Sequence, residues 1–307
     1  MTALSVAFAG TTFQNPVVLA SGTAAYGREL HDIVDLERLG GLVTKAVSLA
    51  PRPGAKAPRV SEFPGGMINA IGLANPGVDA VRDHELPWLA ANLSRARVLV
   101  NVVGNAVEDF AEIITRLEGS AGVCGYELNV SCPNVKAGGM EFGADRAVLA
   151  ALVARARAAT TRALVIKLSP TLPDLVGTAQ VAVDAGADAL TLTNTLPGLV
   201  IDVESRRPRI GFGSGGVSGP PLLPVGVLAT WRVSRAVSVP IVGLGGVSRA
   251  EHALQYIIAG ATLVGVGTAG MVDPRAPERI VTGLEAWCAR HGVTSVASLR
   301  GTLEWPS

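Results

Sequence analysis

A single structural unit recurs along the whole chain: a short β-branched apolar run, a polar or glycine-rich exit, and then a helical pattern. Most of the runs are continuously apolar rather than alternating, as expected of strands that are buried on both faces. Strand–helix alternation predicts a parallel sheet covered by helices. Eight such runs occur, at residues 16–21, 41–45, 98–103, 126–131, 164–169, 189–194, 241–245 and 263–268.

Eight repeats of this unit predict an α/β protein with a (β/α)₈ TIM barrel, whose core usually takes ~250 residues. A doubly wound open sheet is the alternative, but no Gly-x-Gly-x-x-Gly follows the first run. Asp145 and Ser248 are expected N-caps, and Gly186 and Gly260 are expected to end helices. The helical patterns cover residues 106–117, 145–159, 174–185 and 249–259.

The segments outside the repeat are expected to form a hairpin and long loops. Residues 4–8 and 12–14 are predicted to pair as an N-terminal β-hairpin that closes the bottom of the barrel. The connections 46–83 and 195–221 are far longer than the ~2–6 residues typical of such units, and the glycine-rich stretch 136–143 could act as a lid. Active sites of barrel enzymes are built from the loops after the strands, so we expect these long loops to form the active site. The whole chain, residues 1–307, is expected to be a single domain.

Charge and cysteine content exclude several classes of protein. With 26 basic and 25 acidic residues, the chain has no electrostatic footprint for nucleic acid or a membrane surface. No stretch approaches the ~20 apolar residues of a membrane span, and the first residues lack the features of a signal peptide. Cys124, Cys132 and Cys288 have neither metal-ligand spacing nor a disulfide framework, so a cytoplasmic location is expected.

Polar residues gather where the apolar runs end. In a barrel, the carboxyl ends of all parallel strands meet at one rim. Lys45 and Lys167 close apolar runs, where an unpaired ammonium would be costly. A single such lysine could simply pack its stem and extend its head to water. Two of them beside the strand-end residues Asn101, Asn129 and Asn194 favour a shared anionic ligand.

Glycines close the last two runs, in Gly243-Leu-Gly-Gly246 and Gly265-Val-Gly-Thr268. Barrel enzymes often hold a phosphate in the loops after strands seven and eight, where glycines let main-chain N–H groups approach closely. A tight turn would explain either pair alone. Both pairs together favour a phosphate-bearing cofactor.

The richest polar cluster is Asn129-Val-Ser-Cys132-Pro-Asn134. Pro133 has no N–H to donate to a ladder, so Cys132 is expected at a strand exit, where a reactive group can face a pocket. Amide side chains offer both donors and acceptors, so Asn69, Asn129 and Asn194 could together bind a flat cyclic imide.

Four motifs, in this order along the chain, resemble the class 1 dihydroorotate dehydrogenases: Asn-Ala-Ile-Gly-Leu-Ala-Asn-Pro-Gly at 69–77, the cluster at 129–134, Thr-Leu-Thr-Asn-Thr at 191–195 and Ser-Gly-Pro at 218–220. The similarity runs from about residue 15 to about residue 280. The resemblance implies an FMN-bearing (β/α)₈ barrel that oxidises (S)-dihydroorotate to orotate in de novo pyrimidine (UMP) biosynthesis. Ala74 departs from the family pattern, since many relatives have glutamine there.

The resemblance also implies roles for individual residues. Cys132 corresponds to the base that removes a proton from C5 of dihydroorotate while hydride leaves C6 for the flavin, and Lys167 corresponds to a residue beside the reduced flavin. The implied FMN contacts are Ser21, Lys45, Ala46, Asn101, Asn129, Lys167, Thr193, Gly219, Gly245, Gly246, Gly267 and Thr268. The implied substrate contacts are Lys45, Asn69, Ala70, Ile71, Gly72, Leu73, Asn129, Asn134, Asn194 and Thr195.

Residues 20–27 and 201–208 resemble subclass 1B, whose members deliver electrons to NAD through a partner subunit. The implied partner carries FAD and a 2Fe–2S cluster, because this chain has too few cysteines to hold a cluster. The implied assembly is a homodimer core or a heterotetramer. Two alternatives remain open: a related FMN barrel acting on another pyrimidine (similar to dihydropyrimidine dehydrogenase), and a non-catalytic barrel subunit.

Overall fold

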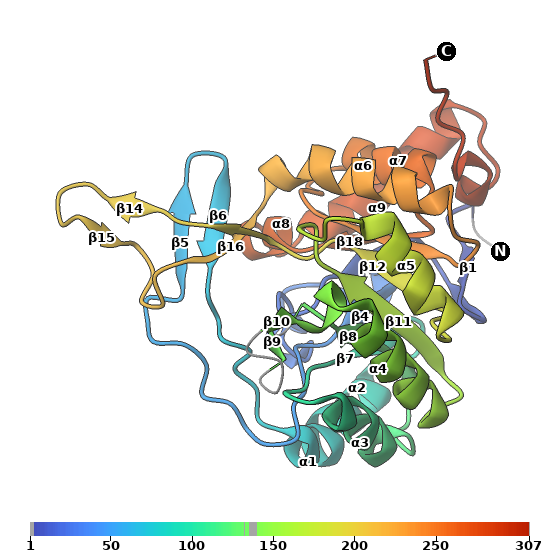
Figure 1. Cartoon of the computed structure of the whole chain (residues 1–307). Coiled ribbons are helices and arrows are strands. Elements are labelled where there is room, and N and C mark those ends of the chain that lie inside the picture. The colour runs from blue at the N-terminus through green and yellow to red at the C-terminus, as the bar shows by residue number, and fades with distance from the viewer. Residues whose placement is uncertain (1–2, 132, 135–139, 307) are drawn as a thin grey trace.

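The computed structural model describes residues 3–131, 133–134 and 140–306 (Figure 1). Within these residues, eight parallel strands form a closed barrel, and each overlaps one of the eight predicted runs, in chain order. Three of them begin before their run, β7 and β11 by one residue and β8 by three. Val264 pairs with Val17, which joins the last strand to the first. The strands are β3 (Val17–Leu19), β4 (Gly41–Val43), β7 (Arg97–Val102), β8 (Val123–Asn129), β11 (Ala163–Leu168), β12 (Ala189–Leu192), β17 (Ile241–Leu244) and β18 (Leu263–Val266). The predicted (β/α)₈ barrel is confirmed.

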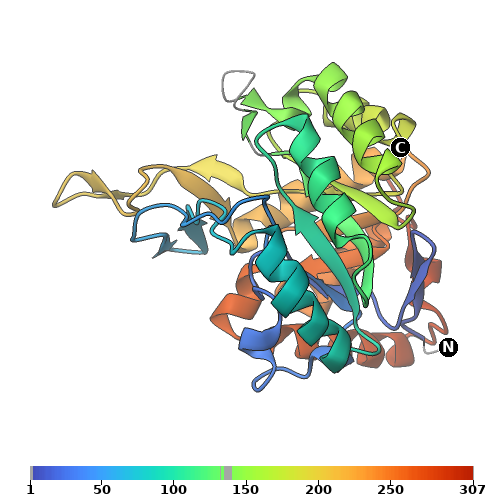
Figure 2. The same cartoon turned by 90° about the horizontal axis from the view of Figure 1, so that it is seen from below.

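Continuous apolar runs became strands because both faces of the barrel wall are covered. All six residues of β11 are buried. Helices pack around the outside of the barrel, as Figures 1 and 2 show. They are α1 (Val78–Ala80), α2 (Leu86–Asn92), α3 (Val107–Leu117), α4 (Arg146–Ala158), α5 (Leu175–Asp184), α6 (Leu223–Ser234), α7 (Ala250–Ala259), α8 (Thr268–Val272) and α9 (Ala276–Arg290). Short 3₁₀ or π turns are η1 (Arg28–Leu30), η2 (Leu36–Arg38), η3 (Val81–Glu85), η5 (Phe142–Ala144), η6 (Pro220–Leu222) and η7 (Val296–Leu299).

Three of the four predicted helix ends are confirmed. The Asp145 carboxylate accepts hydrogen bonds from the first turn of α4, and Gly260 ends α7 with a φ of 120°. Gly186 follows α5 with a φ of 110°. Ser248 as an N-cap is wrong, because α7 begins one residue later, after Arg249. The Ser248 hydroxyl lies instead 3.2 Å from Nδ1 of His252.

The predicted N-terminal hairpin is present. β1 (Val6–Phe8) pairs antiparallel with β2 (Thr11–Phe13), and the buried rings of Phe8 and Phe13 meet edge to face with centroids 5.7 Å apart. Arg97, the first residue of β7, donates through Nε to the carbonyl of Thr12. The hairpin therefore lies at the end of the barrel where the strands begin (Figure 1).

The two long connections form a structure that the sequence did not predict. The first contributes β5 (Val60–Phe63) and β6 (Gly66–Asn69), and the second contributes β13 (Leu196–Gly198) and β16 (Gly215–Ser218). Together they make one four-stranded sheet, β13-β16-β6-β5, which we call the apron. It projects from the barrel opposite β1 and continues into the ribbon of β14 (Ile201–Asp202) and β15 (Arg207–Pro208) (Figures 1 and 2). A short pair, β9 (Pro133–Asn134) with β10 (Met140–Glu141), lies near the same face.

No helix among the described residues combines the length and the hydropathy that crossing a membrane would require.

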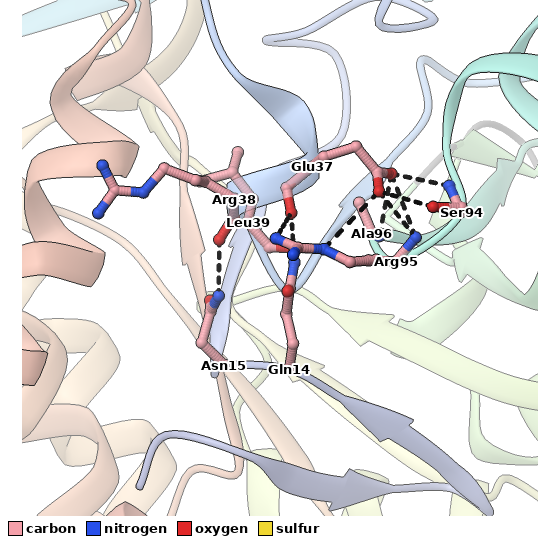
Figure 3. A network of polar contacts seen from close by, with 8 residues as sticks. All are labelled: Gln14, Asn15, Glu37, Arg38, Leu39, Ser94, Arg95 and Ala96. Carbon is pink, nitrogen blue, oxygen red and sulfur yellow. Dashed lines mark hydrogen bonds and ion pairs between the residues drawn. The ribbon is translucent and has the colours of Figure 1, made fainter. Parts of the chain in front are cut away.

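A carboxylate joins two connections beside the barrel (Figure 3). The side chain of Glu37, on η2, accepts hydrogen bonds from the backbone N–H groups of Ser94, Arg95 and Ala96 and from the hydroxyl of Ser94, at 2.8–3.3 Å. Gln14 donates to the carbonyls of Glu37 and Leu39. Burial acts to raise the pKa of Glu37, but these hydrogen bonds outweigh it and lower the pKa below its ordinary value.

Replacing Glu37 by glutamine is expected to lower the free energy of unfolding at neutral pH by about 1–2 kcal/mol, because an amide oxygen cannot accept as many hydrogen bonds. Because the pKa of Glu37 is lower in the folded state, its carboxylate contributes fully to the free energy of unfolding at pH values above about 4.5, the ordinary pKa of a glutamate. This contribution to stability is lost as the pH falls through the lowered pKa that Glu37 has in the folded protein. Urea unfolding from pH 7 to pH 3 measures this difference. Exposed Glu251→Gln serves as the control, and an equal difference at every pH would contradict the assignment.

Candidate active site

A cavity of about 490 Å³ opens at the carboxyl ends of the barrel strands, between the barrel rim and the apron. The structure brings together in its lining all twelve residues that the sequence predicted as FMN contacts. These are Ser21, Lys45, Ala46, Asn101, Asn129, Lys167, Thr193, Gly219, Gly245, Gly246, Gly267 and Thr268. Their common position follows from the barrel, because every parallel strand ends at the same rim.

The residues predicted as substrate contacts divide into three groups. Asn69, Ile71, Leu73, Asn194 and Thr195 line the cavity together with Lys45 and Asn129, whereas Ala70 and Gly72 are not part of its lining. The backbone of Asn134 is described as part of β9, without its side chain. Cys132 lies outside the described residues, so its assignment as the base remains a prediction from sequence.

Amide side chains from distant segments contact one another in the cavity. Nδ2 of Asn194 donates to Oδ1 of Asn129 at 3.2 Å, and Oδ1 of Asn194 accepts from the N–H of Thr195 at 2.8 Å. Nδ2 of Asn69, at the end of β6, donates to the carbonyl of Gly216 on the apron, at 3.2 Å. These contacts fix the amide orientations and leave further donor and acceptor capacity for a ligand.

A charged network lies beneath the cavity, inside the barrel. Lys167, on β11, has a side chain that is only 8% exposed, and its Nζ lies 3.9 Å from Oε1 of Glu127 on β8. Glu127 also accepts from Nδ2 of Asn101 and from the hydroxyl of Thr191, each at 2.7 Å. The ammonium is therefore held at the strand end by a buried carboxylate, as a costly buried charge requires.

Two polar atoms at the cavity have no partner among the described residues. Oδ1 of Asn101 and Oγ1 of Thr193 are both buried without a hydrogen bond there. Buried polar groups in folded proteins are nearly always hydrogen-bonded, to protein or to another molecule. A ligand with polar edges in this cavity would supply the hydrogen bonds that these two atoms lack.

Glycine is required where the loop after β17 meets the cavity. Gly245 and Gly246 have φ angles of 130° and 71°, and a Cβ on Gly246 would lie 2.6 Å from the backbone nitrogen of Leu223. The hydroxyl of Tyr256 donates to the carbonyl of Gly245 at 2.8 Å and so fixes this loop. Across the cavity, the hydroxyl of Thr268 donates to that of Ser218 at 2.8 Å.

Gly246→Ala is expected to weaken binding of a phosphate-bearing flavin by about ten-fold or more, because a left-handed alanine is strained and its Cβ would displace Leu223. The measurement is a titration of flavin-free protein with FMN. Gly10→Ala is the matched control, since Gly10 has a φ of 79° but open space around its Cβ position. Equal FMN affinity in both variants would contradict the role given to this loop.

Sequence reasoning missed two kinds of site residue. Met67, Leu222 and Leu244 supply apolar lining, and nothing in the sequence sets them apart from core residues. Glu127 is different, because a charge in the middle of an apolar run was a usable signal. Cys124, by contrast, donates to the carbonyl of Val98, and burial raises the pKa of its thiol to about 12, which fits a structural role.

The family model described as dihydroorotate dehydrogenase matches residues 3–287 of this chain. The chain belongs to the dihydroorotate dehydrogenase family. Among curated members, the "Dihydroorotate dehydrogenase B (NAD(+)), catalytic subunit" of Pelobacter propionicus is 49% identical over 301 residues, which are 98% of each chain. Proteins of the same name from Geobacter sp. strain M21 and Trichlorobacter lovleyi are 46% and 47% identical, again over 98% of this chain and 98% and 99% of theirs.

Membership of the dihydroorotate dehydrogenase family confirms the resemblance drawn from the four sequence motifs. The names of the relatives are those of the B-type enzyme, which agrees with the resemblance of residues 20–27 and 201–208 to subclass 1B.

Proposed function

We propose that this chain is the FMN-bearing catalytic subunit of a dihydroorotate dehydrogenase, which oxidises (S)-dihydroorotate to orotate in de novo pyrimidine (UMP) biosynthesis. One observation carries the proposal: in a chain of this family, a single cavity gathers two lysines, a set of strand-end asparagines and glycine-rich loops after the last two strands.

The residues of the cavity fit FMN. The main chain at Gly245, Gly246 and Gly267 offers N–H groups without side chains in the way, as a phosphate requires, and Thr268 adds its own main-chain N–H beside them. The unpartnered Asn101 Oδ1 offers an acceptor for an N–H donor on a polar ring edge. When bound, FMN would supply the acceptor for the hydride that leaves C6 of the substrate.

Lys167 would stabilise negative charge that develops beside it during the reaction. Its ammonium lies in a nearly dry site, where a fixed charge acts more strongly than in water. Lys45, which follows β4 and also lines the cavity, would attract the anionic substrate. Preorganised charges of this kind need no rearrangement during the reaction.

Asn69, Asn129 and Asn194 would bind the imide edge of the substrate, since each amide offers both a donor and an acceptor. Ile71 and Leu73, which follow β6, would cover the ring and exclude water. Cys132 would take the proton from C5. A free thiol titrates near ~8.5, and a neighbouring cation favours its thiolate form.

A partner subunit follows from the names of the relatives, each of which is the catalytic subunit of an NAD(+)-linked enzyme. We propose that electrons leave this chain through a subunit carrying FAD and a 2Fe–2S cluster, and that the assembly is a homodimer core or a heterotetramer. The proposed location of that assembly is the cytoplasm.

Anaerobic mixing with dihydroorotate tests the function. The purified protein should contain FMN, and its oxidised absorbance band should bleach rapidly on addition of dihydroorotate. Flavin that resists dihydroorotate but is reduced by dihydrouracil would assign another pyrimidine substrate. A protein that takes up no flavin would indicate a non-catalytic barrel and overturn the proposal.

A further inference from the structure

Glu127 is a charged residue in the middle of a buried barrel strand, and the proposed reaction leaves it without a task. Its two neighbours on β8, Tyr126 and Leu128, are fully buried, and Glu127 itself is 2% exposed. A carboxylate in such a position costs folding free energy unless it is paired and hydrogen-bonded. Its partners therefore indicate what it does.

Those partners come from three other strands of the barrel. Oε2 accepts from the hydroxyl of Thr191 on β12, at 2.7 Å. Oε1 accepts from Nδ2 of Asn101 on β7, at 2.7 Å, and lies 3.9 Å from Nζ of Lys167 on β11. Asn101 and Lys167 line the cavity, whereas Glu127 does not.

The carboxylate determines which way the amide of Asn101 points. An ionised carboxylate only accepts hydrogen bonds, so it must face the NH₂ group of the amide and not its oxygen. Oδ1 of Asn101 is consequently turned away from Glu127, and it is buried with no partner among the described residues. Because Asn101 lines the cavity, this oxygen is the acceptor that we assign to a ligand bound there.

The same carboxylate holds the ammonium of Lys167 and offsets part of its charge. Nζ of Lys167 and Oε1 of Glu127 lie 3.9 Å apart, which is within ion-pair range. Both side chains are almost completely buried, so solvent screens their attraction only weakly. Thr191 contributes by fixing the second carboxylate oxygen. One buried acid thus controls both a neutral acceptor and a cation at the floor of the cavity.

We infer that Glu127 is a positioning residue that presents the Asn101 carbonyl to the flavin and moderates the positive charge that Lys167 places beside it. This inference rests on the proposed function, since it requires that the cavity hold a flavin. It predicts two separate effects of removing the carboxylate: weaker flavin binding, and a more oxidising flavin.

The test is Glu127→Gln, with FMN affinity and flavin reduction potential as readouts. A glutamine can donate to Asn101 and so allow its amide to invert, which should raise the Kd for FMN by about ten-fold. Loss of the negative charge should shift the reduction potential to more positive values, because the reduced flavin gains negative charge. Glu285→Gln, an exposed acid on α9 with a 57% exposed side chain, is the charge-matched control.

Thr191→Val keeps the carboxylate but removes its second anchor, and it preserves the side-chain shape. It should raise the Kd for FMN by about three-fold and leave the potential unchanged. This variant decides the question if Glu127→Gln does not fold, and an unchanged Kd would then overturn the inference.

The outcomes separate the inference from the proposed function. Wild-type protein that binds no flavin overturns both. Flavin binding and reduction by dihydroorotate, with affinity and potential unchanged in Glu127→Gln, overturns the positioning role alone. A purely structural role of Glu127 would weaken binding in Glu127→Gln without the positive shift in potential, and that result too would overturn the inference.

Discussion

Replacing Cys132 by serine is expected to slow reduction of the bound flavin by dihydroorotate by about 10²–10⁴-fold, the usual contribution of a general base. A hydroxyl is a far weaker base than a thiol near neutral pH, so the C5 proton is removed more slowly. The measurement is a stopped-flow trace of the flavin absorbance under anaerobic conditions at saturating dihydroorotate.

The pH profile distinguishes a base from a packing residue. In the wild type, the rate should rise with pH through the titration of a thiol, which ordinarily lies near ~8.5. In Cys132→Ser it should continue to rise at higher pH. Cys288→Ser is the control, because Cys288 is buried on α9 and is not part of the cavity lining, and its rate should match the wild type. A Cys132→Ser enzyme with the wild-type rate and profile would assign the base elsewhere.

Lys167→Met is expected to slow the same half-reaction by about 10²–10³-fold, because it removes a preorganised charge from a nearly dry site. Methionine retains most of the apolar stem between the fully buried residues Ile166 and Leu168. The substitution also leaves Glu127 without its cation, which should lower the free energy of unfolding by about 3 kcal/mol. Stopped-flow reduction and urea unfolding measure the two effects separately.

A double variant separates the two effects of losing Lys167. Lys167→Met combined with Glu127→Gln no longer leaves an unpaired buried carboxylate, so we expect most of the stability to return. The reduction rate should remain low, because no cation is restored. Recovery of the rate together with the stability would mean that Lys167 acts only through folding.

Hydropathy predicted the barrel because the features that define it are local. Each strand is a continuous apolar run, and each rim residue follows its run directly, so the lining positions of Lys45, Asn101, Asn129 and Lys167 could be predicted together. The same reasoning failed at Ser248. The helix α7 begins one residue later than predicted, so its N-cap is Arg249. A difference of that size depends on packing and not on side-chain type.

The apron could not be predicted, because it depends on pairing between distant loops. Each loop forms a local antiparallel pair, β5 with β6 and β13 with β16, but the pairing of β16 with β6, with Ile68 opposite Val217, joins segments far apart in the sequence. The charge of Glu127 within an apolar run is visible in the sequence, but its role is not. Its three partners lie on three other strands, so its role becomes visible only when the barrel closes.

Because the apron forms one wall of the cavity, the cavity is complete only when distant parts of the chain have folded together. The bond from Asn69 to Gly216 spans 147 positions, so one wall of the cavity joins the first quarter of the sequence to its last third. An N-terminal fragment emerging during synthesis has the first lysine and the first asparagines but no opposite wall to hold a ligand. Ligand capture is therefore a late event in folding, and binding energy gained there stabilises the complete barrel against global opening rather than any one of its parts.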